Sequence, residues 1–369
     1  MGHATRMLEV ADLVSKGGGE VAFSSSDEVV RLIESRGYAC NDVPMADVSY
    51  SDQGRFSLRE TMITSPITLA KAYQQMRMEV ANIGRFRPQV VLSDSALSTV
   101  LAARLLRLPV FTVLNQLNLT DPTRRGVPVR LLSAGVSAGM GKLWNLSDEV
   151  LLPDLPPPYT ISERNLWGSR VRNTRYIGFI CASTAWANDG LGEKLASDPR
   201  NKIFWQVSGP PKTRGTFLAK ALEISGQLSD RFVSIVSAGD PAGSSVAERI
   251  QGGWYYGWCR APESYFGLCD LVVSRAGHST IGQVIAASRP SLLVPVPGQA
   301  EQEGNAAKAV RLGISTCVGQ DELTADRALK EIESLLDGRA REKARALHDY
   351  ASRFDAASEV VKTLSSAAT

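Results

Sequence analysis

The segment 270–306, with the sequence DLVVSRAGHSTIGQVIAASRPSLLVPVPGQAEQEGNA, constrains the fold of this chain more than any other. Its apolar runs 271–273 and 291–294 each predict a short buried strand. A helix is expected to begin at Ser279-Thr280 and to end just before Pro290, because proline disfavours helical backbone in the residue that precedes it. Strand, turn, helix and strand make a βαβ unit, which predicts a parallel sheet with helices on its faces.

The turn of this unit, residues 274–278, has the composition of an anion site. At a helix N-terminus, backbone N–H groups without helical partners coincide with the positive end of the helix dipole. Ser279 and Thr280 add hydroxyl donors, and Gly277 lets a ligand approach the backbone. Taken alone, an ordinary βα turn without a ligand explains these residues equally well.

A polar segment after the second strand favours the ligand-binding interpretation. Residues 297–304 are expected to form a loop at the carboxyl end of a strand, the edge where open parallel sheets bind ligands. Two polar βα loops in succession predict a binding crevice. The polar side chains of this second loop are Gln299, Glu301, Gln302, Glu303 and Asn305.

The patterns D-L-V-V-S-R-A-G-x-S-T-I and P-x-P-G-x-x-x-Q-E-x-N-A resemble the nucleotide-sugar half of GT-B glycosyltransferases, above all the MurG-like transferases with archaeal and bacterial relatives. The resemblance implies an α/β fold of two Rossmann-like, doubly wound domains facing a cleft. It implies that Gln302 and Glu303 bind the donor sugar, and it puts Gln283 where the family has a ribose-binding acid. The residues implied to hold the nucleotide diphosphate are Arg275, Ala276, Gly277, His278, Ser279 and Thr280.

Two further segments belong to the expected donor side. The segment S-G-P-x-x-x-R is similar to one in related transferases and makes Ser208, Gly209 and Arg214 further diphosphate candidates, with a plain βα turn as the alternative. Trp258 and Cys259 occupy the place where the family recognises the nucleobase, and a nearby ring could stack on a base. An aromatic cluster that belongs to the core is the alternative there.

Strands and helices alternate along the rest of the chain, which is typical of doubly wound sheets. With 369 residues the chain exceeds the usual single-domain length, so two domains are expected. We place an acceptor-side Rossmann-like domain at 1–165 and a nucleotide-sugar-binding Rossmann-like domain at 166–340. A polar helix is expected from 339 to about 364, and we assign 341–369 as a C-terminal helix that returns toward the first domain.

The acceptor side begins abruptly. A strand and a glycine-rich turn precede the first helix in the family, whereas here only Gly2-His3-x-x-Arg6 stands before an amphipathic helix, so the first strand is expected to be missing. His3 matches the family histidine that faces the acceptor, and a histidine can accept a hydroxyl proton near neutral pH. A frayed terminal histidine without a role is the alternative.

Other acceptor-side candidates follow predicted strands. Asp94 and the pair Asn115-Gln116 come just after the strands at 90–92 and 109–114, so they are expected at the carboxyl edge of the sheet. Asp94 could orient His3, act as the base itself, or cap the next helix. Asn115-Gln116 resembles the family's acceptor-side polar pair.

Composition narrows the function classes. The five cysteines are scattered, which fits a reduced cytoplasmic protein and neither a disulfide framework nor a zinc site. No apolar run reaches the roughly 20 residues that span a bilayer, and no signal peptide is visible. Residues 77–142 contain nine basic and only three acidic residues. This excess of positive charge predicts either an ordinary solvated surface or a surface that attracts anionic lipid or a phosphorylated acceptor. No aromatic-basic motif indicates nucleic-acid binding.

Together these patterns predict metal-independent transfer, with inversion, from a nucleoside diphosphate sugar, expected to be UDP-linked. The acceptor hydroxyl would belong to a soluble or a lipid-linked molecule, the latter presented at the inner face of the cell membrane. No D-x-D motif is present to hold a metal, and no cofactor is expected. A nucleotide-sugar hydrolase of the same superfamily and a non-catalytic recruiting subunit remain alternatives.

Overall fold

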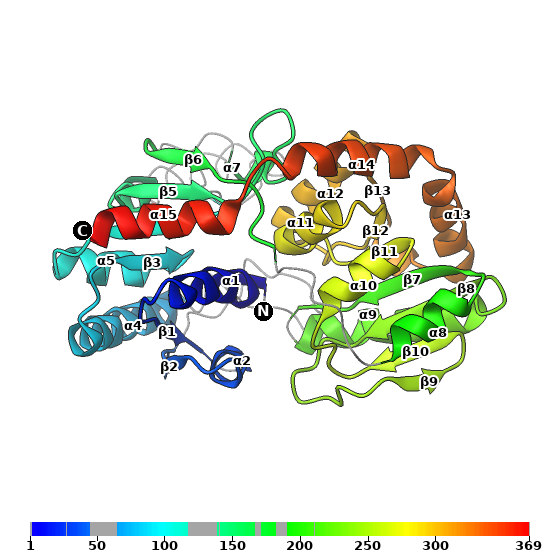
Figure 1. Cartoon of the computed structure of the whole chain (residues 1–369), viewed down its shortest axis with the longest axis horizontal. Helices are drawn as coiled ribbons and strands as arrows, with labels where there is room; N and C mark the ends of the chain where they lie inside the picture. The colour runs from blue at the N-terminus through cyan, green and yellow to red at the C-terminus, as the bar shows by residue number, and fades with distance from the viewer. Residues whose placement is uncertain are drawn as a thin grey trace. The chain divides into compact units, whose positions relative to one another are not determined.

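The structure, a computed structural model, describes residues 2–26, 28–44, 65–116, 139, 141–166, 171–181, 190–209 and 211–368 (Figure 1). The described chain forms two compact units. Unit 1 contains the described residues up to Ile180 and those from Phe354 onward, and unit 2 contains those from Cys181 to Arg353. The units therefore divide after Ile180, whereas the boundary expected from the sequence was after residue 165. The C-terminal tail is shared between the two units.

Unit 1 contains two parallel sheets. β1 (Ala22–Ser25) pairs with β2 (Ala39–Asp42), and a second sheet has the order β3-β4-β5-β6. Among the described residues no ladder joins β1 to β3, so each borders its own sheet. The strands of the second sheet are β3 (Val91–Asp94), β4 (Val110–Val113), β5 (Glu149–Leu152) and β6 (Thr174–Tyr176).

Helices cover both faces of the four-stranded sheet. Alternate residues of each strand point to opposite faces, and the apolar side chains of each face pack against a different pair of helices. Val91, Val110 and Val150 pack with residues of α4 (Ser65–Phe86) and α5 (Leu97–Leu105). The next residues along, Leu92 and Leu151, pack with residues of α1 (Gly2–Lys16) and α15 (Ala356–Ala368). The remaining described helices of unit 1 are α2 (Glu28–Ser35) and α7 (Glu163–Leu166).

The C-terminal tail is two helices, so the expected single helix over 339–364 is wrong. α14 (Arg339–Ala351) belongs to unit 2 and α15 to unit 1. The break has local causes: the Ser352 hydroxyl donates to the His348 carbonyl at 2.8 Å, and Asp355 Oδ1 accepts from Ser358 N at the start of α15. Between the helices, Phe354 lies against Gly178, whose φ of +83° is the left-handed conformation that favours glycine.

Unit 2 is built on a seven-stranded sheet in the order β13-β12-β11-β7-β8-β10-β9. All neighbours are parallel except β9, which pairs antiparallel with β10 in a hairpin that the sequence analysis does not predict. The six parallel strands have the order 3-2-1-4-5-6 of the dinucleotide-binding fold. The strands are β7 (Asn201–Gln206), β8 (Phe232–Ser237), β9 (Glu248–Ile250), β10 (Gly253–Tyr256), β11 (Leu271–Ser274), β12 (Ser291–Leu293) and β13 (Ser315–Cys317).

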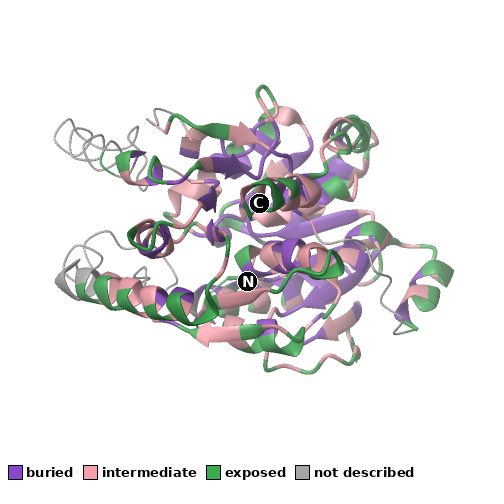
Figure 2. Cartoon of the chain, turned by 60° about the vertical axis from the view of Figure 1, so that its left-hand side comes forward, coloured by how far each residue is buried: buried purple, intermediate pink, exposed green. Residues whose placement is uncertain are grey.

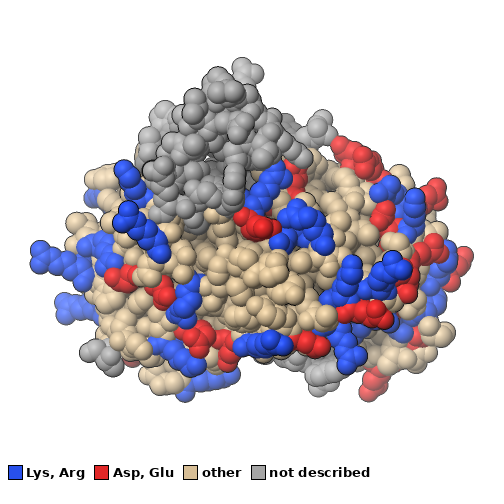
Figure 3. Space-filling view, turned by 90° about the horizontal axis from the view of Figure 1, so that it is seen from above, with Lys and Arg blue, Asp and Glu red and all other residues tan. Residues whose placement is uncertain are grey.

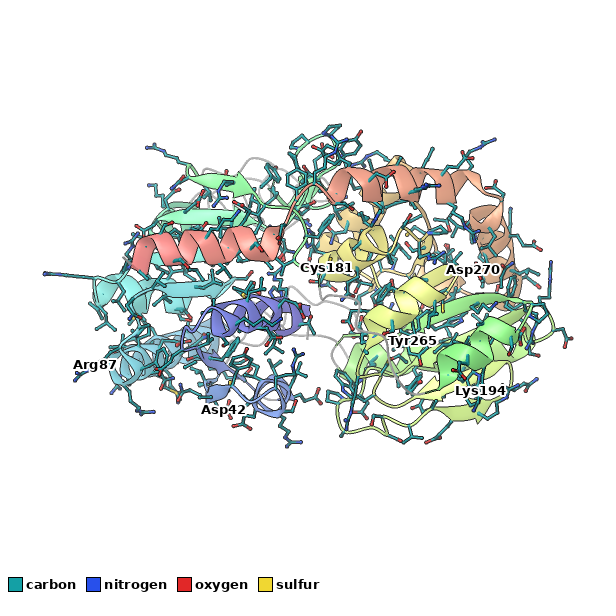
Figure 4. All side chains as sticks on the ribbon, viewed as in Figure 1. Asp42, Arg87, Cys181, Lys194, Tyr265 and Asp270 are labelled. Atoms are coloured by element: carbon teal, nitrogen blue, oxygen red, sulfur yellow. The ribbon has the colours of Figure 1, made fainter. Side chains whose placement is uncertain are left out.

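Helices also cover both faces of this sheet, whose strands are largely buried (Figure 2). α9 (Pro211–Gln227) and α13 (Ala325–Leu336) pack on one face around Trp205. α8 (Leu191–Ser197), α10 (Pro262–Leu268) and α11 (His278–Ala286) pack on the other around Phe204 and Tyr265, the latter labelled on α10 in Figure 4. α12 (Ala300–Leu312) and the short 3-10 helix η1 (Gln320–Glu322) complete the unit.

The strand order creates a switch point between β7 and β11. These central strands pair in parallel, with Gln206 opposite Ser274, but their connections run toward opposite edges of the sheet. Open α/β sheets bind ligands at such a point, beyond the carboxyl ends of the strands. The loops that follow β7 and β11 are the two segments in which the sequence predicted diphosphate contacts.

Candidate active site

The N-terminus of α11 in unit 2 has the features of an anion site. Its N-cap is Gly277, with extended backbone, and no side chain caps the first N–H groups. Ser279 and Thr280 are partly exposed in the first turn, whereas His278 and Ala276 are buried. Backbone donors and the positive helix end therefore lie beside two accessible hydroxyls.

The neighbouring segment holds this turn in place. Asn305 is fully buried on α12 and donates from Nδ2 to the carbonyl of Ala276 at 3.2 Å. Gln302 Oε1 accepts from Val296 N at 3.0 Å. The side-chain NH₂ of Gln302 therefore remains to donate hydrogen bonds to a ligand. Gln302 and Glu303 belong to the first turn of α12, not to a loop, because the turn at Pro297-Gly298 ends at Gln299 and helix-forming residues follow.

The second predicted turn lies across the switch point. Ser208 is partly exposed and Gly209 is exposed with a φ of +111°, a conformation suited to glycine. Arg214 donates from Nη1 to the carbonyl of Gly239, and its Nη2 lies 3.6 Å from Asp240 Oδ1. The Arg214 guanidinium therefore joins the first turn of α9 to the loop after β8.

Arg275 does not have the position expected of a diphosphate ligand. Its side chain is 1% exposed, and its guanidinium donates to protein oxygens and stacks 4.6 Å from the centre of the Phe217 ring. Burial lowers its pKa to about 10, which still leaves it cationic at neutral pH. The sequence could not show this inward orientation, because the accepting carbonyls come from segments far apart in the chain.

The residues expected near the base and ribose differ in accessibility. Cys259 is buried, with its side chain in the core beside Tyr256, so only its backbone remains available to a ligand. Trp258 is partly exposed, and its backbone N–H donates to the Ser244 carbonyl at 2.9 Å. Gln283 is partly exposed on the second turn of α11.

In unit 1, His3 and Arg6 reach the same carboxylate. Helix α1 begins at Gly2, so these residues are one turn apart on one face of it. His3 Nδ1 lies 2.8 Å from Asp94 Oδ1, and Arg6 contacts both oxygens, with Nε 2.7 Å from Oδ2. The side chain of His3 is 58% exposed, whereas Arg6 is buried and the side chain of Asp94 is 9% exposed. Arg6 is not among the site residues predicted from the sequence, although its three-residue spacing from His3 was available as a signal.

Asp94 is suited to orienting His3 and not to acting as a base. Burial alone would raise its pKa, but the Arg6 guanidinium and then His3 outweigh it and hold the pKa of the carboxyl well below its usual range. His3 Nδ1 also lies 3.0 Å from Arg6 Nη2. An ionised carboxylate only accepts hydrogen bonds, so in the tautomer whose Nδ1–H donates to Asp94, Nε2 is left as a proton acceptor. The capping alternative is wrong, since α5 has Ala96 as its N-cap and no side-chain cap.

Asn115 and Gln116, the pair expected on the acceptor side, differ in exposure. Asn115 is buried, and its Oδ1 lies 3.4 Å from both terminal nitrogens of Arg6, whereas Gln116 is partly exposed. The basic residues Arg124, Arg125 and Arg130, expected near a membrane or a phosphorylated acceptor, lie outside the described residues.

No group of three or more His, Cys, Asp or Glu side chains in the described ranges is placed to hold a metal ion. None of the described helices is both long and apolar enough to cross a membrane.

Comparison with known proteins agrees with this geometry. Residues 257–361 match the glycosyltransferase family 28 C-terminal domain, and residues 1–132 match glycosyl transferase family 1. The glycotransferase of kitacinnamycin has a similar fold, with a TM-score of 0.71 at 16% identity over 99% of this chain and 96% of that one. The fold and these matches define the class: the chain is a glycosyltransferase of the GT-B fold.

Two sequence relatives narrow the comparison. An uncharacterized glycosyltransferase of Methanosarcina mazei is 26% identical over 361 residues, which is 96% of this chain and 92% of the relative. Over 80 residues, 21% of each chain, there is 36% identity to an Anaeromyxobacter UDP-N-acetylglucosamine–N-acetylmuramyl-(pentapeptide) pyrophosphoryl-undecaprenol N-acetylglucosamine transferase. The chain thus combines a match to the family 28 C-terminal domain with a glycosyltransferase relative over nearly its whole length.

Proposed function

We propose that unit 2 binds a UDP-sugar and that unit 1 supplies the base that activates an acceptor hydroxyl. The observation that carries the proposal is the position of the turns after β7 and β11, which flank the switch point of the sheet, with an uncapped helix N-terminus on the β11 side. The uridine assignment is supported by the Anaeromyxobacter relative, which is named for a UDP-sugar donor.

The proposed reaction is a single displacement with inversion. The acceptor oxygen forms a bond to the anomeric carbon, while the bond from that carbon to the diphosphate oxygen breaks. The hydroxyl proton passes to His3 Nε2, and the nearby Asp94 carboxylate stabilises the resulting imidazolium. The N–H groups at the start of α11 and the hydroxyls of Ser279 and Thr280 stabilise the charge on the leaving diphosphate. We propose that no metal is required.

The direct test is turnover of UDP-sugars. Wild-type protein is incubated with a panel of UDP-sugars and acceptors, with and without EDTA, and UDP release and product configuration are measured. UDP release that needs an acceptor and survives EDTA supports the proposal. Release without an acceptor favours a hydrolase, and failure to bind UDP in calorimetry favours a non-catalytic subunit.

We further propose that the acceptor is lipid-linked and that unit 1 contacts an anionic membrane. The Anaeromyxobacter relative is named for an undecaprenol-linked acceptor. In unit 1, the connections that precede the adjacent strands β3, β4 and β5 meet at one edge of the sheet, and each carries exposed large apolar side chains. We call this edge the basic rim; its apolar members are Phe86, Leu105, Leu106 and Leu146.

Hydrogen bonds join the segments of the basic rim. Arg104 donates to the carbonyl of Leu146 and pairs with Asp148 at 2.6 Å, and Asp148 Oδ2 accepts from Val110 N. Lys and Arg side chains gather at this end of unit 1 (Figure 3), with Arg87 at the end of α4 (Figure 4). Apolar side chains among cations suit a surface of anionic headgroups. The exposed cations of the rim are Arg85, Arg87, Arg107, Lys142 and Arg172.

Vesicle binding tests the basic rim. Because Asp94 ends β3 and the rim lies at the starts of the strands, changing the rim should alter vesicle binding and leave turnover of a soluble acceptor intact. The double variant Leu105→Ser/Leu106→Ser is compared with Val310→Ser, which changes an exposed apolar side chain of unit 2. Loss of sedimentation with phosphatidylglycerol vesicles in the double variant alone supports the proposal, and equal sedimentation of all three proteins contradicts it.

A further inference from the structure

The buried side chain of Arg275 joins the carboxyl ends of four strands of unit 2. Arg275 follows β11. Its Nη1 donates to the carbonyls of Val294 at 3.1 Å and Pro295 at 3.3 Å, just after β12. Its Nη2 donates to the Thr213 carbonyl at 2.9 Å, after β7, and to Gln320 Oε1 at 2.6 Å, after β13. One guanidinium thus links the loops on both sides of the switch point.

The acceptors of Arg275 are three main-chain carbonyls and one amide oxygen. Within the described part of the chain, no carboxylate contacts this guanidinium. A buried cation without an ionic partner is costly, and water screens its field little. Gly277, the N-cap of the helix turn proposed to bind diphosphate, lies two residues further along.

We propose that Arg275 is a positioning residue of the donor site, which fixes the loop ends and holds one uncompensated buried positive charge behind the diphosphate turn. The inference rests on the proposed function, since it takes the donor diphosphate as the charge that responds. It gives Arg275 a role without contact: the guanidinium acts on the phosphates through its field and through the loops that it holds. Its effect should therefore grow with the number of phosphate charges on the ligand.

The sharpest variant adds a counter-charge without removing the arginine. Gln320→Glu keeps the size of the side chain and its hydrogen bond to Nη2, but it puts a carboxylate on the guanidinium. If the uncompensated charge matters, the Kd of this variant for UDP should rise by about tenfold or more. The Kd for UMP should rise less, because UMP has fewer phosphate charges to interact with the guanidinium. Its melting temperature should stay the same or rise, since a buried cation gains a partner.

Matched variants separate charge from geometry. Asn201→Asp adds the same charge at the exposed start of β7, the opposite end of the strand from the loops, and should leave UDP affinity unchanged. Arg275→Lys keeps the charge but loses the fork that links the loops, so it should bind UDP better than Arg275→Gln. Uridine, which has no phosphate charge, should bind equally to wild type and to Gln320→Glu.

Calorimetry with UDP, UMP and uridine decides the outcome. A loss in Gln320→Glu that rises from uridine through UMP to UDP supports the inference. Equal Kd for UDP in wild type and Gln320→Glu, or an equal loss for UMP and UDP, would overturn the inference and leave the donor site standing. Failure of the wild type to bind UDP would overturn the proposed donor site and this inference together.

Discussion

His3 Nδ1 lies 2.8 Å from Asp94 Oδ1, although the two residues are 91 positions apart in the chain. The contact joins the first turn of α1 to the end of β3, and Arg6 holds the other side of the same carboxylate. An imidazole oriented in this way presents Nε2 as its proton acceptor, which is the property required of a general base.

Replacing His3 by glutamine should remove the base and leave donor binding intact. We expect kcat to fall by about 10²- to 10⁴-fold, the usual contribution of general base catalysis. UDP affinity should stay unchanged, because the proposed donor residues belong to unit 2. Steady-state kinetics and calorimetry measure the two effects, with His348→Gln on α14 as the control. A kcat within twofold of wild type would refute the role of His3.

Replacing Asp94 by asparagine should lower stability in a pH-dependent way. The pKa of Asp94 is depressed in the folded protein relative to about 3.9 in an unfolded chain, so its stabilisation is complete above that value and is lost as the pH falls through the folded pKa. The melting temperature of Asp94→Asn should therefore lie well below that of wild type at pH 7, with the gap narrowing below about pH 4.

Thermal melts between pH 3 and pH 8 test this, with Glu333→Gln as the control. Glu333 pairs with Arg231 on the surface, where both side chains are about half exposed, so its loss should change stability little at any pH. A pH-independent difference between wild type and Asp94→Asn would show that the ion pair with Arg6 is not its cause.

Replacing Gln302 by alanine should impair use of the donor. Its Oε1 accepts from Val296 N, which leaves the amide N–H groups to donate to sugar hydroxyls. We expect a higher KM for the UDP-sugar, by about tenfold for a lost hydrogen bond of typical strength, and an unchanged KM for the acceptor. Gln299→Ala, at the N-cap of the same helix, is the matched control. Unaltered kinetics with every donor would remove Gln302 from the site.

Replacing Gly178 by alanine should destabilise unit 1. An added Cβ would collide with Phe354, and the φ of +83° is strained for alanine by about 1 kcal/mol or more. Protection of amides in β5 and β6 against hydrogen exchange should fall, whereas β7 and β11 in unit 2 should be unaffected. Gly84→Ala, on α4 with no atom near the added Cβ, is the control and should not destabilise the protein. Equal protection in Gly178→Ala and wild type would contradict the packing argument.

Local patterns predicted most of the fold. The strand and helix around 271–286 lie within one to three residues of their expected bounds, because apolar runs and Pro290 mark them. The β9–β10 hairpin was missed, although Gly252-Gly253 between Ile250 and Trp254 is a hairpin signal. Ser352 and Asp355 were local signals for the tail break, but the packing of Phe354 on Gly178 between the two helices depends on residues far away in the sequence.

Long-range contacts also limited the prediction of the site. Residues in accessible turns, such as Ser279 and Thr280, lie where the motif placed them. Arg275 was expected to face the ligand, because a sequence shows a positive charge but not the carbonyls that bind it. Arg6 shares a carboxylate with His3 only because β3 brings Asp94 beside α1.

The division of the tail at Phe354 has a consequence for synthesis. Domains generally fold as units while the ribosome extends the chain, and the N-terminal domain usually folds first. Unit 1 obtains α15, with the buried Ala356 and Val360, only after the residues of unit 2 have been translated. Unit 2 ends at Arg353, so its chain is complete before that of unit 1. Unit 1, most of which is translated before unit 2, is therefore expected to reach its native packing after unit 2.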